Sequence, residues 1–105
     1  MTLSVHELQL RLKADTPVRL VDVREEDEWN ICRLPGAVLI PLGELDARAD
    51  DELEPEEQIV VYCHHGIRSA RAQHILMTRG FHHVYNLAGG IEDWAREIDL
   101  SMPRY

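Results

Sequence analysis

The fold is decided by the stretch Gln58-Ile59-Val60-Val61-Tyr62-Cys63-His64-His65-Gly66-Ile67-Arg68. Its first five residues form the most apolar segment of the chain and predict a buried strand. From Ser69 to Arg79 the apolar residues recur at helical spacing, which predicts a helix directly after the loop. A strand that runs through a short loop into a helix is the repeating unit of α/β proteins.

The same alternation extends in both directions along the chain. Apolar, β-branched segments predict further strands at 18–23, 37–40 and 83–87. Helices are predicted from Val5 to a stop at Pro17, at 42–48 and at 91–98, with a short polar helix or turn at 24–29. Strands separated by helices imply parallel neighbours joined by right-handed crossovers, so the predicted class is α/β with helices on both faces of the sheet.

Two helix ends have recognisable sequence signals. Ser4 followed by Glu7 fits a capping box, in which both side chains bond otherwise unpaired backbone amides. Gly80 fits the left-handed residue after a helix, because it lacks the Cβ that makes that conformation costly. Phe81 is its expected apolar partner.

Composition indicates one domain over residues 1–105, with 45% hydrophobic and 29% charged residues. The formal net charge of −8 argues against nucleic acid or an anionic membrane as partner, because both attract basic patches. No apolar run approaches the ~20 residues that span a bilayer. The N-terminus lacks the features of a secretory signal, and two cysteines suggest free thiols in a reducing compartment, so a cytoplasmic location is expected.

Cys63 occupies the carboxyl end of the central strand, where ligands bind in open α/β sheets. The residues from Cys63 to Arg68 can curl so that backbone amides point inward, with Gly66 allowing close approach. A helix that begins near Ser69 adds its positive end, and this field favours a thiolate. The sequence thus predicts an anion-binding loop with a nucleophilic thiol; the alternative is a buried structural cysteine.

The motif Cys63-x-x-Gly66-x-Arg68-Ser69 resembles the active-site loop of single-domain rhodaneses, the thiosulfate sulfurtransferases. Further motifs of that family follow in its usual order over nearly the whole chain: Leu20-Val21-Asp22-Val23-Arg24 with Glu28-Trp29, Pro35-Gly36-Ala37 with Ile40-Pro41, and Leu87-x-Gly89-Gly90-Ile91-x-x-Trp94. The ending Ser101-Met102-Pro103-Arg104-Tyr105 is similar to rhodanese modules appended to ubiquitin-activating-like adenylyltransferases.

The resemblance implies a three-layer α/β/α fold whose five-stranded, mainly parallel sheet has the order 3-2-4-5-1 and a short first strand near Met1–Leu3. It also implies sulfur transfer by double displacement, in which Cys63 takes a sulfane sulfur from thiosulfate or a similar donor. A thiol, cyanide or a protein thiol then accepts that sulfur from the Cys63 persulfide. No metal or organic cofactor is required. The expected donor-binding loop consists of His64, His65, Gly66, Ile67, Arg68 and Ser69, with Arg68 placing the donor or bracing the loop.

Two other functions remain open on the sequence. One is a sulfur-relay or persulfide-carrier module that uses the same thiol without turning over free thiosulfate. The other is a phosphatase or arsenate reductase, which resembles this family but carries Cys-x5-Arg. Here four residues separate Cys63 from Arg68, and the smaller loop favours a single sulfur over a tetrahedral oxyanion.

Residues near other strand ends have weaker claims to a site. Asp22 and Arg24 are interpreted as supporting residues, most simply as an ion pair that braces the loops. Cys32 and Arg33 stand where the family usually has Gly-His, and Cys32 is a candidate resolving thiol if its Cα lies within ~7 Å of that of Cys63. Gly89-Gly90 is expected to let one loop pass close to another.

The remaining prominent residues are interpreted structurally. The pairs His64-His65 and His82-His83 lack the spacing of zinc sites. Trp29 and Trp94 are expected to be core or half-buried residues. The acidic stretch 50–57 is interpreted as a solvated connection, with a docking surface for a basic partner as the alternative. Oligomeric state is not predicted.

Overall fold

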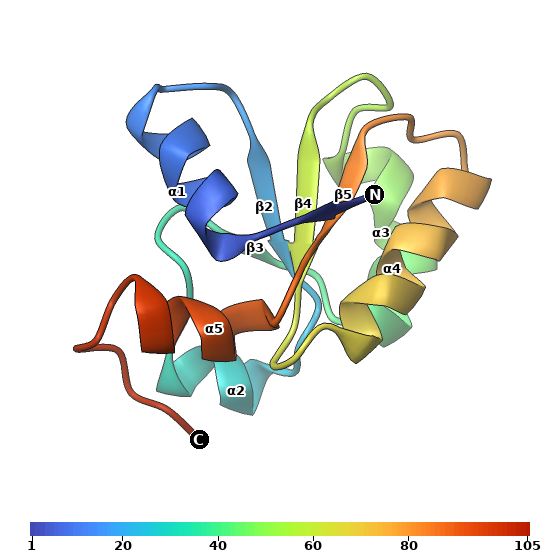
Figure 1. Cartoon of the computed structure of the whole chain (residues 1–105). Helices are drawn as coiled ribbons and strands as arrows, with labels where there is room; N and C mark the ends of the chain where they lie inside the picture. Colours follow the sequence, from blue (N-terminus) through green and yellow to red (C-terminus); the bar gives the residue numbers. More distant parts are fainter.

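A computed structural model describes all 105 residues as one five-stranded sheet with helices on both faces (Figure 1). The strands are β1 (Thr2–Leu3), β2 (Arg19–Asp22), β3 (Val38–Leu39), β4 (Ile59–Tyr62) and β5 (Val84–Leu87). Their order across the sheet is β1-β5-β4-β2-β3, and every neighbouring pair is parallel. The expected order 3-2-4-5-1 and the α/β class are confirmed, including the short first strand.

The central strand β4 is buried on both faces of the sheet, which explains its continuous apolar sequence. Successive side chains of a strand point to opposite faces. Accordingly, Val61 and Cys63 belong to one core cluster, whereas Val60 and Tyr62 belong to the other. Cys63 therefore lies on a defined side of the sheet, at the carboxyl end of its central strand.

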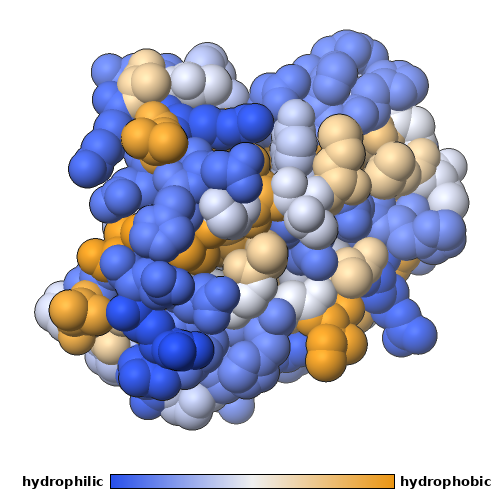
Figure 2. All heavy atoms as spheres, in the orientation of Figure 1, coloured by the Kyte–Doolittle hydropathy of each residue, from blue (hydrophilic) through white to orange (hydrophobic).

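The helices form the two outer layers (Figure 1). On one side lie α1 (Val5–Lys13), α2 (Glu26–Ile31) and α5 (Gly90–Glu97); on the other lie α3 (Leu45–Glu52) and α4 (Ile67–Thr78). The face of the molecule in Figure 2 is mostly hydrophilic, with hydrophobic atoms gathered in a band between α1 and α5. No helix of this chain has the length and apolarity needed to cross a membrane.

Both predicted helix-end signals are confirmed. The Ser4 hydroxyl accepts from the Glu7 amide and the Glu7 carboxylate accepts from the Ser4 amide, each at 3.1 Å. At the end of α4, Gly80 has φ +93°, its amide donates to Met77 O, and the Phe81 amide donates to Leu76 O. Together these two hydrogen bonds form a Schellman motif. Phe81 is buried in the core, with 2% of its surface exposed.

Some predicted boundaries are wrong. The helix after the Cys63 loop begins at Ile67, two residues before Ser69, because Gly66 at φ +112° serves as its N-cap. Predicted helix 42–48 is a 3-10 turn (Leu42–Glu44) followed by α3, which extends to Glu52. The first part of the acidic stretch 50–57 is therefore helical, and only its remainder is a connection.

Candidate active site

The Cys63 sulfur lies inside a tight loop formed by residues 63–66 and the first turn of α4. The amides of Gly66 and Ser69 donate to Cys63 Sγ at 3.1 and 3.4 Å, and Ser69 Oγ lies 3.3 Å from it. Gly66 is required here for its left-handed backbone rather than for space, since a Cβ at this position would meet nothing closer than 3.8 Å. The sulfur is thus surrounded by donors, and Cys63 is only 1% exposed.

The surroundings of Cys63 favour its ionised form. Burial raises the pKa of the thiol, but hydrogen bonds from Ser69, Gly66 and His65 to the sulfur outweigh burial. The pKa therefore lies below its ordinary value. The positive end of α4, a 12-residue helix that begins beside the sulfur, acts in the same direction.

Asn86 on β5 is a member of this site that sequence reasoning missed. Its Oδ1 accepts a 2.6 Å hydrogen bond from Ser69 Oγ, and its Nδ2 donates to Gly66 O at 3.1 Å. Asn86 is 8% exposed. An asparagine in an otherwise apolar parallel strand, immediately before the Leu87-x-Gly89-Gly90 motif, is the signal that could have identified it.

The N-terminus of α5 is hydrogen-bonded to the backbone of the Cys63 loop. The amides of Ile91 and Glu92 donate to the carbonyls of Cys63 and His64 at 2.9 and 3.1 Å. A Cβ on Gly90 would lie 2.5 Å from Cys63 O and 2.4 Å from His64 O. The close approach expected at Gly89-Gly90 is therefore real, and Gly90 is the residue that permits it.

Arg68 is held by an ion pair with Glu28. Its Nη1 and Nη2 donate to the two carboxylate oxygens of Glu28 on α2, at 2.7 and 2.9 Å. These two hydrogen bonds from Arg68, with a further one from Tyr105, lower the pKa of Glu28 more than its burial raises it. The pKa of Glu28 is about 2. Of the two roles expected for Arg68, the geometry fits bracing; sequence reasoning missed Glu28 as its partner.

Asp22 and Arg24 form a fully buried ion pair, with 2.7 Å between Arg24 Nη2 and Asp22 Oδ2. The guanidinium also donates to Cys32 O and to the hydroxyl of Tyr105. Arg24 thus connects β2, the end of α2 and the C-terminal residue. This arrangement matches the interpretation of Asp22 and Arg24 as a brace beside the loop.

The C-terminal residue lies against the loop. The Tyr105 ring stacks on His64 at 3.9 Å, and His64 stacks on His65 at 4.0 Å. The Tyr105 hydroxyl donates to Glu28 Oε2 at 2.7 Å, and burial together with that carboxylate raises the pKa of Tyr105 to about 12. Sequence reasoning gave Tyr105 no role, because only tertiary structure brings it here. Ile67, by contrast, is 83% exposed at the start of α4.

The structure does not favour Cys32 as a resolving thiol. Cys32 packs against the core cluster that contains Tyr62, whereas Cys63 belongs to the cluster on the other face of the sheet. Both thiols are free. The two tryptophans lie as expected: Trp94 is 6% exposed, and Trp29 is half-buried beneath the Arg33 guanidinium.

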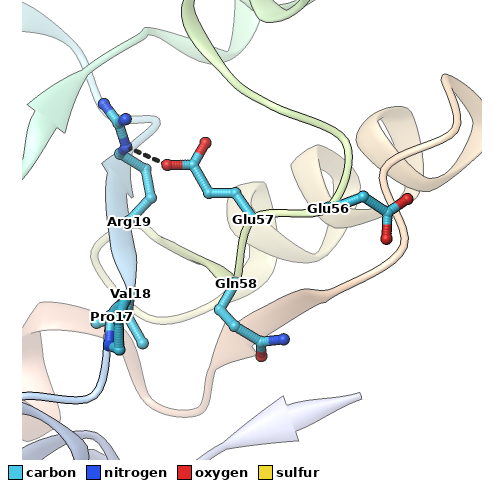
Figure 3. A pocket seen from close by; sticks show the side chains of 6 residues that line it. All are labelled: Pro17, Val18, Arg19, Glu56, Glu57 and Gln58. Carbon is cyan, nitrogen blue, oxygen red and sulfur yellow. Dashed lines mark hydrogen bonds and ion pairs between the residues drawn. The ribbon is translucent and has the colours of Figure 1, made fainter.

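A pocket of about 410 Å³ lies at the opposite end of the sheet from Cys63 (Figure 3). It is lined by the residues that lead into β2 and β4: Pro17, Val18, Arg19, Glu56, Glu57 and Gln58. Arg19 and Glu57 form an ion pair of 2.8 Å across it. None of the residues that line this pocket belongs to the Cys63 loop. No group of three or more His, Cys, Asp or Glu side chains is arranged to hold a metal ion.

Comparison with known proteins agrees with this geometry. The family model described as "Rhodanese-like domain" matches residues 4–97. The chain belongs to the rhodanese-like domain family. Human single-domain sulfurtransferase TSTD1 superposes with a TM-score of 0.83 at 28% identity, over 91% of this chain and 96% of that one.

Two curated relatives contain the rhodanese-like domain as part of a longer chain. "Putative sulfur carrier protein YrkF" of Bacillus subtilis is 36% identical over 92% of this chain and 52% of its own length. "Adenylyltransferase and sulfurtransferase MOCS3" of Drosophila yakuba is 38% identical over 98% of this chain and 24% of its own length. The chain thus spans about half of the first relative and about a quarter of the second, and it belongs to a family that includes both sulfurtransferases and sulfur carriers.

Proposed function

We propose that this rhodanese-like chain is a sulfurtransferase that carries a sulfane sulfur on Cys63. The observation that carries the proposal is the pair of backbone amides, of Gly66 and Ser69, that donate to Cys63 Sγ, with the Ser69 hydroxyl 3.3 Å from the same sulfur. Fixed donors around a sulfur stabilise negative charge on it, both on the attacking thiolate and on the product persulfide. Membership of the family supports the same chemistry.

The reaction proceeds in two displacements. The Cys63 thiolate attacks the outer sulfur of thiosulfate, the S–S bond of the donor breaks, and sulfite leaves with the electron pair. The acceptor, a thiolate or cyanide, then attacks the outer sulfur of the Cys63 persulfide, and the Cys63 thiolate leaves. No oxidant or reductant is consumed, and the two steps return the enzyme to its starting state.

The burial of Cys63 sets a condition on both steps. At 1% exposure, the sulfur is reached only when the loop that surrounds it moves. The guanidinium of Arg68 is held by Glu28, so the attraction for anionic thiosulfate is assigned to the backbone amides of the loop.

Persulfide formation is tested directly by incubating the protein with thiosulfate and measuring its intact mass. We expect a gain of one sulfur atom that reductant removes and that Cys63→Ser abolishes. Cys32→Ser serves as the matched control and is expected to gain the sulfur normally. A protein that gains no sulfur from several sulfane donors contradicts the proposal, as does a gain that survives Cys63→Ser.

A sulfur-carrier function is the second candidate, and the YrkF relative favours it. A carrier forms the same persulfide but delivers it to a partner protein, with little turnover of free thiosulfate and cyanide. Steady-state thiocyanate production separates the two: sustained turnover supports an enzyme, whereas a single equivalent per chain supports a carrier. Hydrolysis of an aryl phosphate that requires Cys63 would instead revive the phosphatase alternative, which the four-residue spacing between Cys63 and Arg68 disfavours.

A further inference from the structure

The hydroxyl of Ser69 faces two acceptors but has one proton to donate. One acceptor is Cys63 Sγ at 3.3 Å, and the other is Asn86 Oδ1 at 2.6 Å. All three residues are buried, at 1%, 0% and 8% exposure for Cys63, Ser69 and Asn86, so water does not relieve this competition. The shorter hydrogen bond is the one to Asn86.

The orientation of the Asn86 amide is fixed by its second contact. Its Nδ2 donates to Gly66 O at 3.1 Å, and a carbonyl accepts only from a donor, so the NH2 group must face Gly66. Oδ1 must then face Ser69. The amide cannot flip to donate to Ser69 without setting its own oxygen against the Gly66 carbonyl. Asn86 is therefore a fixed acceptor for the Ser69 proton.

This geometry gives two hydrogen-bonding states. When Cys63 is a thiol, its S–H donates to Ser69 Oγ, the Ser69 hydroxyl donates to Asn86 Oδ1, and Asn86 Nδ2 donates to Gly66 O, so the three side chains form one continuous chain of hydrogen bonds. When Cys63 is a thiolate, the Ser69 proton can bond the sulfur only by leaving Asn86 Oδ1 without its buried donor. An unpaired buried acceptor is unfavourable.

We propose that Asn86 is a positioning residue that withdraws the Ser69 hydroxyl from the Cys63 sulfur and so limits how readily that sulfur becomes the nucleophile. The proposal deepens the sulfurtransferase function, on which it rests. In this role Asn86 changes the nucleophilicity of the Cys63 sulfur through Ser69. It does not contact the sulfur donor or the sulfur acceptor of the reaction.

The charged groups around the loop do not account for this effect. The ionisable side chains around it are His64 and His65 in the loop, Arg68 on α4, Glu28 on α2, Asp22 and Arg24 at the end of β2, Glu92 on α5 with its partner Arg104, and Tyr105. None of them has a side-chain hydrogen bond to Cys63 Sγ. Replacing Asn86 by a neutral residue leaves all of these charges unchanged.

The test is the pH dependence of Cys63 alkylation by iodoacetamide, resolved from Cys32 by peptide mass spectrometry. In Asn86→Leu, Ser69 donates to the thiolate alone, so the midpoint of the profile moves to lower pH. On the acidic side of the profile, alkylation is expected to be roughly threefold to tenfold faster than in the unmodified chain. Gly66 O remains bonded to the Ala70 amide, so the N-terminus of α4 is retained.

Two comparisons separate this role from a purely structural one. In a Ser69→Ala background the hydroxyl is absent, and adding Asn86→Leu is expected to leave the alkylation profile unchanged. Gln73→Leu is the matched control, because the Gln73 side-chain amide also bridges α4 to β5, at 2.9 Å from Val84 O, without contact to the sulfur. It is expected to lower thermal stability without moving the profile.

An unchanged or higher midpoint in Asn86→Leu overturns the proposal, and so does an equal shift in the presence and absence of Ser69. Asn86→Ala is measured in parallel, so that a failure of the leucine variant to fold does not decide the outcome. Alkylation does not depend on sulfur transfer. Loss of persulfide formation would therefore contradict the proposed function while leaving this inference standing, and the reverse also holds.

Discussion

At the residue scale, the loop around Cys63 is predictable from sequence because its contacts are local. A cysteine after an apolar strand, followed three residues later by glycine, predicts a thiol within a loop of backbone donors, and Gly66 does donate to the sulfur. Asn86 and Glu28 could not be found this way. Each acts through a partner 17 or 40 residues away, and their contacts exist only once strands and helices are assembled.

Glu28 is expected to make stability dependent on pH through its fork with Arg68. Its pKa is lowered from 4.5 to about 2, chiefly by the hydrogen bonds from Arg68. Because the pKa of Glu28 is lower in the folded chain, its ionised form stabilises the fold at every pH above the pKa of the unfolded chain, about 4.5. This contribution is lost as the pH falls from about 4.5 to about 2. The Arg68 side chain is 37% exposed, so solvent screening limits the contribution to roughly 1–2 kcal/mol.

Glu28→Gln tests this contribution, because it keeps the shape and removes the charge. At neutral pH the variant is expected to unfold at lower urea concentration, by the same roughly 1–2 kcal/mol. The difference from the unmodified chain should vanish near pH 2. Glu26→Gln, on the same helix and exposed, is the control and should change stability little at any pH. A Glu28→Gln deficit that persists at pH 2 would show that the contact does not act through the charge.

At the element scale, the alternation of strands and helices is predictable, and so is the start of α1, but the starts of α4 and α5 are not. Gly66 and Gly89 both begin helices with a left-handed backbone and no side-chain cap, so neither start has the Ser, Thr, Asp or Asn signal that marked the first helix. The short strands β1 and β3 have only two residues each, too few for a periodic pattern. β1 was expected only through the family resemblance.

The junction between α5 and the Cys63 loop is expected to be intolerant of any side chain. In Gly90→Ala, the new Cβ would overlap the carbonyls of Cys63 and His64, at 2.5 and 2.4 Å, and the backbone φ of +61° is itself strained for alanine. The loop must then move away from α5, which breaks the hydrogen bonds from Ile91 and Glu92. We expect a loss of roughly 2–4 kcal/mol in unfolding free energy and slower persulfide formation.

Gly43→Ala is the matched control for that variant. A Cβ at Gly43 meets nothing within 4 Å, and its backbone is not left-handed. It is expected to keep both stability and persulfide formation within experimental error. Equal behaviour of the two variants, in urea unfolding and in intact-mass kinetics, would contradict the role assigned to the contact at Gly90.

At the scale of the whole molecule, the net charge of −8 acts against the anionic donor that the proposed reaction uses. The cationic side chains beside the loop do not offset this field, because Arg68, Arg24 and Arg104 are each paired with a carboxylate. Only the backbone donors and the positive end of α4 attract an anion, and these act at short range. Approach of an anion to Cys63 is therefore expected to be slowed by repulsion at a distance.

Salt should relieve this repulsion, because exposed charges are screened beyond about 10 Å at ~0.1 M ionic strength. Raising the salt concentration from about 10 mM to about 300 mM is expected to accelerate alkylation of Cys63 by iodoacetate roughly twofold to fivefold. Iodoacetamide, which is neutral, provides the control and should change little, since its approach does not depend on the field. If salt instead slows the reaction with iodoacetate, the expectation is wrong, because the positive field of the loop then extends beyond the carboxylates that surround it. In that case electrostatic attraction, rather than random encounter, brings the anionic sulfur donor to Cys63.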